Sequence, residues 1–393
     1  MRLFEKCYNF TDARALKNAG CYPYFKSVES GLDAEVTIDG KKVIMLGSNN
    51  YLGLANHPKV KEAAKKAVDR YGVGCTGSRL LTGTLDIHIK LERKLAEFLN
   101  KEDALVFSTG FQTNLGTISS LVTRHDILLI DKEDHASILD GCRLSYGKIF
   151  KFKHNDVKHL GSLLANFPED MGKLIVVDGI YSVSGDIVNL PDIMKVCEKY
   201  KANLMLDEAH SLGVFGKGGR GTGEYFGLEE KLDIVMGTFS KSFGSIGGFI
   251  VAKEPIIDFV KHHSRPFIFS ASMPPPSVAA VLAALEIVEK EPERRDKFWT
   301  NTNLIKKGLY EIGFKVSMNK SSIVALFIGE ESLTFTFWQS LFDEGVFTNP
   351  IITPAVPKNG AILRISCMAT HNEKSLIRVL EIFERVGKRL KII

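Results

Sequence analysis

Several features that mark specialised protein classes are missing from this sequence. Its 6 cysteines include no CxxC pair, which argues against a disulfide framework or a zinc site and favours reduced thiols in the cytoplasm. No apolar run approaches the ~20 residues that a membrane-spanning helix needs. The N-terminal stretch is charged throughout, unlike a signal peptide. The sequence therefore predicts a cytoplasmic protein with no integral membrane segment.

An excess of charge of one sign is also missing. The 51 Lys and Arg residues are nearly balanced by 46 Asp and Glu, and a net charge of +5 does not favour nucleic acid as a partner. With 45% hydrophobic and 25% charged residues, the composition is that of an ordinary globular protein and excludes a fibrous or disordered chain. At ~100–200 residues per domain, 393 residues predict two or three domains.

Short runs rich in Val, Ile and Leu alternate with helical or loop segments from about residue 58 onward. Continuous apolar strands that alternate with helices are typical of a parallel sheet covered on both faces. The runs are ALVFS (104–108), DILLID (126–131), LIVVDG (174–179), NLMLDE (203–208), DIVMGT (233–238) and GGFIVA (247–252). We therefore predict an α/β fold with a mostly parallel sheet.

The chain on either side of these strands follows other patterns. A short helix, an irregular stretch and a hairpin around Asp39-Gly40 are expected first. The prolines of SMPPPS (272–277) interrupt the strand–helix pattern, and VAAVLAALEIVEKEPERR (278–295) predicts one long amphipathic helix. We expect an N-terminal segment (1–50), a large domain (51–285) and a small α+β domain (286–393).

Polar residues stand at the ends of several predicted strands, namely Ser108, Asp131, Asp178, Asp207 and Thr238. In open α/β sheets, ligands bind outside the carboxyl ends of the strands. We therefore expect the functional site at this edge of the sheet.

Lys241 follows one of these strands, in the glycine-rich stretch GTFSKSFGSIGG (237–248). Taken alone, a loop lysine is most often a solvated side chain. A partly desolvated lysine can instead lose its proton and form a Schiff base. No Walker-type GxxxxGKS or GxxxxGKT motif is present. The stretch GKGGRGTG (216–223) lacks the strand-to-helix setting of a dinucleotide fingerprint, so we expect a flexible surface loop there.

The motif DEAH (207–210) places Asp207 and His210 directly after another strand. A carboxylate in this position often only caps a turn. Together with Lys241, however, Asp207 matches the anionic partner that the ring nitrogen of a pyridine cofactor needs, and His210 suits the phenolic oxygen. The three residues together suit a pyridine cofactor held through a Schiff base, such as pyridoxal 5'-phosphate.

Two further strand ends carry candidate cofactor contacts. In STGFQTN (108–114), Gly110 would let a phosphate approach the free N–H groups of a helix start, although many helices begin this way. His135, in EDHASILDG (133–141), could stack on a flat ring, although a loop histidine is more often satisfied by local hydrogen bonds. No histidine spacing suits a metal, and we predict no metal site.

Together these motifs resemble the α-oxoamine synthase family of fold-type I pyridoxal-phosphate enzymes, over nearly the whole chain. The resemblance rests on SNNYLGL (48–54), GCTGSRLLTGTLDIHIKLE (74–92), STGFQTN (108–114), DHASILDG (134–141), DGIYSVSGD (178–186), LDEAHSLGVFGKGGRGT (206–222), GTFSKSFGSIGG (237–248) and FSASMPPPS (269–277). It implies a mostly parallel large domain, a smaller α+β C-terminal domain, and a homodimer with its active site at the subunit interface.

The resemblance also implies a role for each matching residue. Lys241 would form the Schiff base and then remove the α-proton. Asp207 would pair with the ring nitrogen and His210 with the phenolic oxygen, while His135 would stack over the ring beside the substrate. The remaining implied contacts are with the phosphate (Gly110, Phe111, Thr238, Ser240 and, from the other subunit, Ser270 or Ser272), with the cofactor's edge (Ser182) and with the amino-acid carboxylate (Asn49 and Arg364).

The implied reaction is a decarboxylating condensation of an amino acid with an acyl-CoA. The wording of TLDIHIKLE, GFQTN, FSKSFGS and FTNPIITPAVP is most similar to the bacterial branch that uses L-serine and a long-chain acyl-CoA. Sister enzymes that take alanine with pimeloyl-CoA, or glycine with acetyl-CoA, share the catalytic set and stay as the alternative. A non-catalytic partner subunit is disfavoured because Lys241 and Asp207 are both present, and an aminotransferase because the motif wording is specific.

Overall fold

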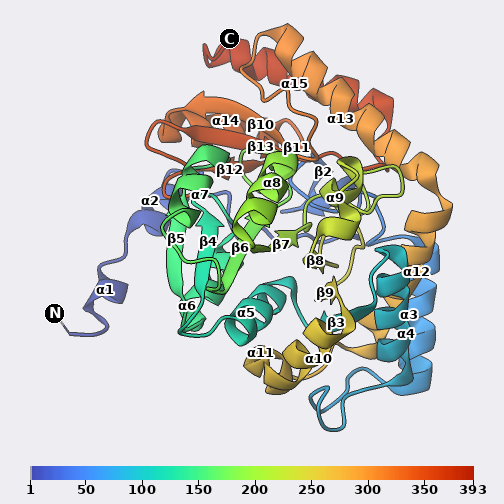
Figure 1. The fold of residues 1–393 in the computed structure, drawn as a ribbon. Coiled ribbons are helices and arrows are strands. Elements are labelled where there is room, and N and C mark those ends of the chain that lie inside the picture. Colours follow the sequence, from blue (N-terminus) through green and yellow to red (C-terminus); the bar gives the residue numbers. More distant parts are fainter. Residues whose placement is uncertain (1) are drawn as a thin grey trace. The chain divides into compact units, whose positions relative to one another are not determined.

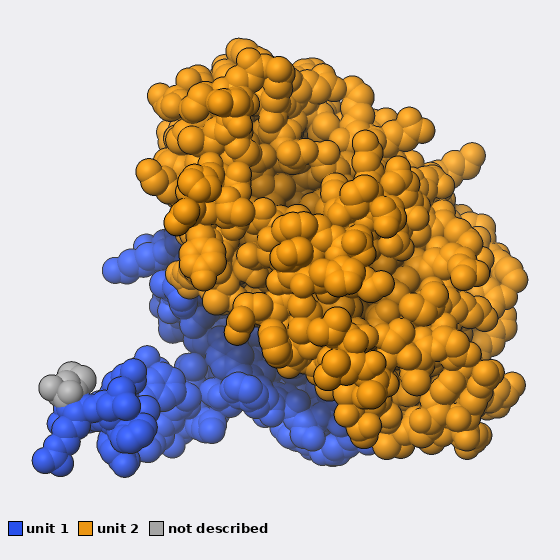
Figure 2. Space-filling model, turned by 60° about the horizontal axis from the view of Figure 1, so that its bottom comes forward, with its two compact units in different colours: residues 1–48, 299–318, 323–393 blue, residues 49–298, 319–322 orange. Residues whose placement is uncertain are grey.

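The computed structural model describes residues 2–393 and divides into two compact units (Figure 2). Unit 2 comprises Asn49–Phe298 together with Asn319–Ser322. Unit 1 joins the N-terminal segment, up to Ser48, with Trp299–Met318 and Ile323–Ile393. Each unit has its own buried apolar core.

A 7-stranded sheet forms the centre of unit 2, in the order β3-β9-β8-β7-β6-β4-β5 (Figure 1). All neighbouring pairs are parallel except those of β9, which runs antiparallel to both β3 and β8. The mostly parallel sheet predicted from the apolar runs is confirmed. The strands are β3 (Asp103–Phe107), β4 (Ile127–Asp131), β5 (Lys148–Phe152), β6 (Lys173–Asp178), β7 (Asn203–Asp207), β8 (Ile234–Thr238) and β9 (Gly248–Ala252).

Strand β5 was not predicted from the sequence. Its residues, KIFKF, include two lysines and so do not form a continuous apolar run. The strand lies at the edge of the sheet and pairs with β4. An edge strand is partly solvated, so it does not need the continuous apolar pattern of the central strands.

Helices cover both faces of this sheet. On one face, α5 and α10 contribute Ile118, Ile257 and Val260 to a core that includes Leu128 and Ile250 of the strands. Helix α8 contacts β7, while α4 contacts β3 and packs with α12, which also packs on α3. The helices of this part of the chain are α3 (Pro58–Tyr71), α4 (Asp86–Phe98), α5 (Gly110–Leu121), α6 (Ala136–Leu144), α7 (Val157–Leu164), α8 (Leu190–Tyr200), α9 (Thr222–Tyr225), η1 (Glu229–Lys231), α10 (Glu254–His263), α11 (Arg265–Ile268) and α12 (Pro275–Lys290).

The single helix predicted over 278–295 is wrong. The structure has two helices there, α12, which ends at Lys290, and α13 (Pro292–Ile312). Between them, Glu291 has φ −117° and ψ 63°, outside the helical region. The residue before a proline is disfavoured in the α conformation, and Pro292 has no N–H to continue the first helix.

Unit 1 has an α+β architecture built from both ends of the chain. The predicted hairpin is present as β1 (Glu35–Ile38) and β2 (Lys41–Met45), with Asp39 and Gly40 at φ 51° and 70° in its turn. Strand β2 also pairs in parallel with β11. The remaining elements are α1 (Glu5–Tyr8), α2 (Asp12–Asn18), β10 (Val324–Gly329), α14 (Glu331–Asp343), β11 (Val346–Phe347), β12 (Asn349–Ile351), β13 (Ala361–Ile365) and α15 (Glu373–Arg389).

The compact units place one boundary after Ser48, close to the predicted residue 50, and the later one after Phe298 instead of residue 285. The N-terminal segment is not separate, because its strand β2 completes a sheet with β11 from the C-terminal part. The later boundary falls inside α13, between Phe298 and Trp299. Among residues 2–393, no helix has the length and apolar character required to cross a membrane.

Candidate active site

The carboxyl ends of the parallel strands carry the polar residues noted in the sequence. Asp131, Asp178, Asp207 and Thr238 are the last residues of β4, β6, β7 and β8. Register pairs Asp178 directly with Asp207 across β6 and β7. The structure therefore places these carboxylates at one edge of the sheet, where ligands of open α/β folds bind.

Asp207 is held by donors from two elements. Its Oδ2 accepts a 2.7 Å hydrogen bond from Asn114 Nδ2 of α5, and its Oδ1 accepts one of 2.9 Å from the backbone N–H of Ala209. The residue is only 3% exposed. A buried carboxylate with hydrogen-bond donors is fixed in place and is suited to face a positively charged ligand atom.

His210 lies three residues further on and is also buried. Its Nδ1 is 2.7 Å from the hydroxyl of Tyr51, and its backbone carbonyl accepts a 2.8 Å hydrogen bond from Ser322 Oγ. Because Nδ1 is engaged by Tyr51, the orientation of the imidazole ring is set.

His135 caps the start of α6. Its Nδ1 accepts from the backbone N–H of Ser137 at 3.2 Å and lies 2.7 Å from Ser137 Oγ. Its own backbone N–H donates to Asp178 Oδ2 at 2.8 Å. Burial and the nearby charge of Lys241 lower the pKa of His135, although Asp207 opposes them, so the ring is neutral at pH 7.

Lys241 stands in a tight turn between β8 and β9. Its carbonyl accepts from the backbone N–H of Gly244 at 2.9 Å, and the next residue, Ser242, donates from its hydroxyl to the carbonyl of Leu212 at 2.6 Å. The charge of Lys241 helps to lower the pKa of His135, and it opposes the burial that raises the pKa of Asp178. The structure thus brings Lys241, Asp207 and His135 together.

The start of α5 and the end of β8 form a close-walled cradle. Thr109 caps α5 by accepting from the backbone N–H of Gln112 at 3.1 Å. A Cβ on Gly110 would lie 2.6 Å from Thr238 Oγ1, so only glycine fits there without displacing Thr238. Thr238 Oγ1 is in turn 2.9 Å from Ser240 Oγ. Hydroxyls and helix N–H groups are the donors that phosphate oxygens prefer.

The other predicted site residues lie in several places. Ser270 accepts from Gln112 Nε2 at 2.9 Å, at the start of α5, whereas the hydroxyl of Ser272 donates to the carbonyl of Gly77 at 3.1 Å. Phe111 is the second residue of α5 and is 43% exposed. Ser182 is half-buried in the turn after β6.

Asn49 and Arg364 belong to different units. Asn49 lies in unit 2, where its Oδ1 accepts from the hydroxyl of Tyr51 at 3.5 Å. Arg364 is buried in β13 of unit 1, opposite Ala325 of β10 and Asn349 of β12. The role that the family resemblance implies for these two residues at the amino-acid carboxylate stays a prediction.

The expectation of a flexible surface loop over 216–223 is wrong. Glu224 accepts from the backbone N–H groups of Gly218 and Arg220 at 2.7 and 2.9 Å. Glu208 accepts from the backbone N–H of Thr222 at 3.0 Å and of Gly223 at 2.8 Å. Thr222 and Gly223 are buried. Carboxylates that satisfy backbone donors hold a glycine-rich segment in one conformation, which composition alone does not indicate.

The sequence analysis did not single out Asn114, Ser137 or Tyr51. Each lies inside a quoted motif, but its hydrogen-bond partner depends on the fold. Asn114 Nδ2 also donates to Ser137 Oγ at 2.9 Å, so it joins α5 to both the α6 start and Asp207. The one signal in the sequence for Asn114, Ser137 and Tyr51 is that each lies inside a motif that also holds a predicted site residue.

These observations agree with comparisons to known proteins. The chain belongs to the aminotransferase class I and II family, whose sequence pattern matches residues 41–383. A serine palmitoyltransferase of Sphingobacterium spiritivorum is 49% identical over 391 residues, which is 100% of this chain and 98% of that protein. An 8-amino-7-oxononanoate synthase of Thermoanaerobacter pseudethanolicus is 42% identical and covers 96% of both chains.

Solved structures give the same class. Serine palmitoyltransferase from S. paucimobilis with a bound PLP–myriocin aldimine superposes with a TM-score of 0.96 at 36% identity, over 99% of this chain and 98% of that one. An 8-amino-7-oxononanoate synthase from Francisella tularensis gives a TM-score of 0.74 at 28% identity, over 88% of this chain and 98% of that one. The protein has the fold of the fold-type I pyridoxal-phosphate transferases and is a pyridoxal-phosphate-dependent acyltransferase of the α-oxoamine synthase type.

The residues present fit pyridoxal phosphate. Asn114 Oδ1 is buried and has no hydrogen-bond partner among the described residues. A buried acceptor of this kind suits a polar ligand atom at this edge of the sheet. Gly110 lets the start of α5 pack directly against Thr238, which brings the helix N–H groups and the Thr238 hydroxyl together as donors for a phosphate. The buried carboxylate of Asp207 suits the ring nitrogen, and the neutral ring of His135 suits the ring face. Lys241 suits the aldehyde.

Proposed function

We propose that this enzyme condenses L-serine with a long-chain acyl-CoA, with loss of CO2, to give 3-ketodihydrosphingosine and CoA. The proposal rests above all on one observation. The serine palmitoyltransferase of S. spiritivorum shares 49% of its residues with the chain over nearly its full length. Serine palmitoyltransferases of two Bacteroides species are 45% identical to the chain. The activity would place the enzyme at the step that forms a sphingoid base.

The second candidate is the activity of the sister enzymes, which take alanine with pimeloyl-CoA or glycine with acetyl-CoA. The 42% identity to an 8-amino-7-oxononanoate synthase supports the alanine reaction as the alternative. The serine reaction is preferred because identity to its representatives is higher and their structural likeness is greater, with TM-scores of 0.96 against 0.74.

The proposed cofactor contacts follow the site geometry. Asp207 would face the ring nitrogen, His210 the phenolic oxygen, and His135 the ring face. Lys241 would be the point of covalent attachment at the aldehyde carbon. The phosphate would be held at the start of α5 by Gly110 and Phe111, and by Thr238 and Ser240, with Ser182 at the cofactor's edge. When bound, pyridoxal phosphate supplies an electron sink that makes removal of the amino acid's α-proton feasible.

The protein's own groups would direct the reaction. Once the amino group of the substrate has replaced Lys241 at the aldehyde carbon, the freed Lys241 Nζ would take the proton from the α-carbon, and Asn49 and Arg364 would hold the carboxylate. A new C–C bond joins the α-carbon to the thioester carbonyl carbon, and the CoA thiol leaves. The carboxylate then departs as CO2, and its electron pair is taken up with a proton at the α-carbon. His135, neutral at pH 7, can donate one hydrogen bond to the substrate without adding a charge.

The proposal includes a cytoplasmic homodimer whose active site lies at the subunit interface. Ser270 and Ser272 are the candidates to reach the other subunit's phosphate. Within this chain, Ser270 accepts from Gln112 in the first turn of α5. Size-exclusion chromatography with light scattering tests the dimer, and a monomeric holoenzyme with full activity would contradict it.

The substrate choice is tested by a matrix of amino acids and acyl-CoAs. Purified holoenzyme is mixed with serine, alanine or glycine and with palmitoyl-, pimeloyl- or acetyl-CoA, and released thiol is followed. We expect the highest kcat/KM for serine with palmitoyl-CoA. A preference for alanine with pimeloyl-CoA, or for glycine with acetyl-CoA, would overturn the substrate choice while leaving the enzyme class intact.

A further inference from the structure

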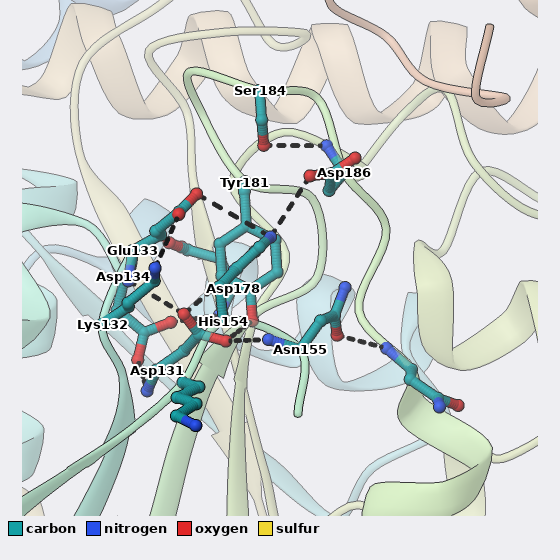
Figure 3. A network of polar contacts seen from close by, with 12 residues as sticks. Asp131, Lys132, Glu133, Asp134, His154, Asn155, Asp178, Tyr181, Ser184 and Asp186 are labelled. Atoms are coloured by element: carbon teal, nitrogen blue, oxygen red, sulfur yellow. Dashed lines mark hydrogen bonds and ion pairs between the residues drawn. The ribbon is translucent and has the colours of Figure 1, made fainter. Parts of the chain in front are cut away.

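A polar network centred on His154 lies in the loop between β5 and α7 (Figure 3). His154 Nδ1 is 3.0 Å from Asp131 Oδ1, and Nε2 is 3.2 Å from Asp186 Oδ2. The ring stands edge-on to Tyr181, with centroids 4.4 Å apart at 85°. One imidazole therefore joins the end of β4 to the turn that follows β6.

The carboxylate of Asp131 is saturated with donors. In addition to His154, it accepts from the backbone N–H of Asn155 at 2.7 Å and from the hydroxyl of Tyr181 at 3.1 Å. Burial opposes its ionisation, but the bond from His154 and the backbone donors lower the pKa of Asp131. Its side chain is 0% exposed and that of His154 is 16% exposed. The two residues form a largely buried ion pair.

His154 is a cation at neutral pH. Burial works against its charge, but hydrogen bonds to Asp131 and Asp186 raise the pKa of His154 to about 9. Glu133 adds a third carboxylate, with its Oε2 3.8 Å from His154 Nε2. A single imidazolium therefore offsets the mutual repulsion of three acidic groups from two loops.

From Asp131 the network continues to His135. The backbone N–H of Asp131 donates to Asp134 Oδ2 at 2.7 Å, and Asp134 Oδ1 accepts from the backbone N–H of Asp178 at 3.1 Å. The side chain of Asp178 then accepts from the backbone N–H of His135 at 2.8 Å. Because these donors are backbone groups, the carboxylates determine the conformation of the segment that ends in His135.

On its other side the network holds the turn that carries Ser182. The backbone N–H of Tyr181 donates to the carbonyl of Asp186 at 3.0 Å, and that of Gly185 donates to the carbonyl of Tyr181 at 3.0 Å. Asp186 Oδ1 accepts from the side-chain amide of Asn319. His154 therefore binds this turn through Asp186, at a point four residues from Ser182.

We propose that His154 is a positioning residue of the active site, which clamps the segment carrying His135 to the turn carrying Ser182. No atom of His154 belongs to the proposed cofactor contacts, and its effect passes through Asp131 and Asp186. The inference rests on the proposed roles of His135 and Ser182, but not on the choice of amino acid or acyl chain.

The test uses purified holoenzyme carrying His154→Gln. We expect about tenfold weaker pyridoxal-phosphate binding, a changed visible circular dichroism of the bound cofactor, and kcat lowered by about tenfold or more. The KM for the amino acid should change by less than about twofold. The matched control is His125→Gln, an exposed histidine before the opposite end of β4, which should leave all four quantities unchanged.

A milder second variant guards against loss of folding. Asp186→Asn keeps the side-chain shape at a position that is 38% exposed, and it removes the negative charge from one of the two strong contacts of His154. It should change kcat and the cofactor's circular dichroism in the same direction but less. In the double variant the two effects should be smaller than additive, because both act through one contact.

A lower unfolding temperature with unchanged circular dichroism and kcat in His154→Gln would overturn the proposal, since His154 would then support only the fold. If that variant does not fold, unchanged values in Asp186→Asn would overturn it equally. A wild-type protein that binds pyridoxal phosphate but condenses no amino acid would contradict the proposed function instead, and the spectroscopic comparison would still decide the role of His154.

Discussion

Asn114 Nδ2 lies 2.7 Å from Asp207 Oδ2, although the two residues are 93 positions apart in the sequence. The amide of a helix thus holds the carboxylate at the end of a strand. The same nitrogen donates to Ser137 Oγ, which in turn contacts the ring of His135. Through one side chain, the proposed ring-nitrogen partner and the proposed ring-stacking histidine are oriented together.

Replacing Asn114 should weaken cofactor binding. Asn114→Leu keeps the approximate volume but leaves Asp207 with one donor fewer. A hydrogen bond to a charged group is worth about 1.5–3 kcal/mol, so we expect the dissociation constant of pyridoxal phosphate to rise by about tenfold or more. Fluorescence titration of apoenzyme measures this. Ser120→Ala, on the same helix, is the control, because the Ser120 hydroxyl donates to the carbonyl of Thr117 within that helix. Equal affinities would contradict the proposed role.

Lys241→Ala should abolish covalent attachment of the cofactor. The absorbance band of the lysine-bound cofactor should disappear, while free pyridoxal phosphate still binds at the remaining contacts. Product formation should fall below detection. Lys217→Ala is the matched control and should retain both band and activity, because Lys217 is exposed and its contact with Arg295 is made through its backbone carbonyl. Persistence of the band in Lys241→Ala would show that another residue is attached.

Two substitutions separate the ring of His135 from its capping role. His135→Phe keeps an aromatic face but removes the nitrogen that caps α6, so it should destabilise the fold by about 1 kcal/mol and largely retain cofactor affinity. His135→Asn keeps a capping side chain but removes the ring, so it should leave stability close to wild type and weaken cofactor binding. Urea unfolding and cofactor titration measure the two effects. The reverse pattern would exclude a stacking role.

Gly110→Ala should disturb the proposed phosphate cradle. The new Cβ would meet Thr238 Oγ1 at 2.6 Å and Thr238 Cβ at 2.9 Å, so either Thr238 or the start of α5 must shift. We expect the dissociation constant of pyridoxal phosphate to rise at least about tenfold. Gly161→Ala is the control, because its Cβ would meet only one atom, at 4.0 Å, within helix α7. A normal dissociation constant in Gly110→Ala would place the phosphate elsewhere.

The ion pair of His154 should make stability depend on alkaline pH. The pKa of His154 rises from its ordinary value of 6.5 to about 9 on folding, so its contribution is complete below pH 6.5 and is lost as pH rises through 9. The separation corresponds to about 3 kcal/mol. Asp131 and Asp186 have lowered pKa values and stay ionised across this range.

Urea unfolding at pH 6, 8 and 10 checks this expectation for the wild type and His154→Gln. The difference in unfolding free energy between the two proteins should be largest at pH 6 and should shrink toward pH 10. A difference that does not change with pH would mean that His154 contributes by packing alone, through Tyr181 and its other neighbours.

Much of the central sheet was predictable because its strands are buried on both faces. The runs that end at Asp131, Asp178, Asp207 and Thr238 are continuous and apolar, and each ends within a residue or two of its observed strand. Strand β5 escaped prediction because an edge strand tolerates lysines. The break at Pro292 was overlooked, although proline is a local signal that could have been read from the sequence.

The sequence by itself determined the class of protein, since Lys241, Asp207, His210 and His135 sit in motifs specific enough to indicate a pyridoxal-phosphate enzyme. It also determined that these residues follow strands of one sheet. Only the tertiary structure decided which side chains hold them: Asn114 on Asp207, Tyr51 on His210 across 159 positions, and the network of His154 on His135. Such pairings depend on register and helix packing, which bring distant residues within about 3 Å, and no local pattern encodes that distance.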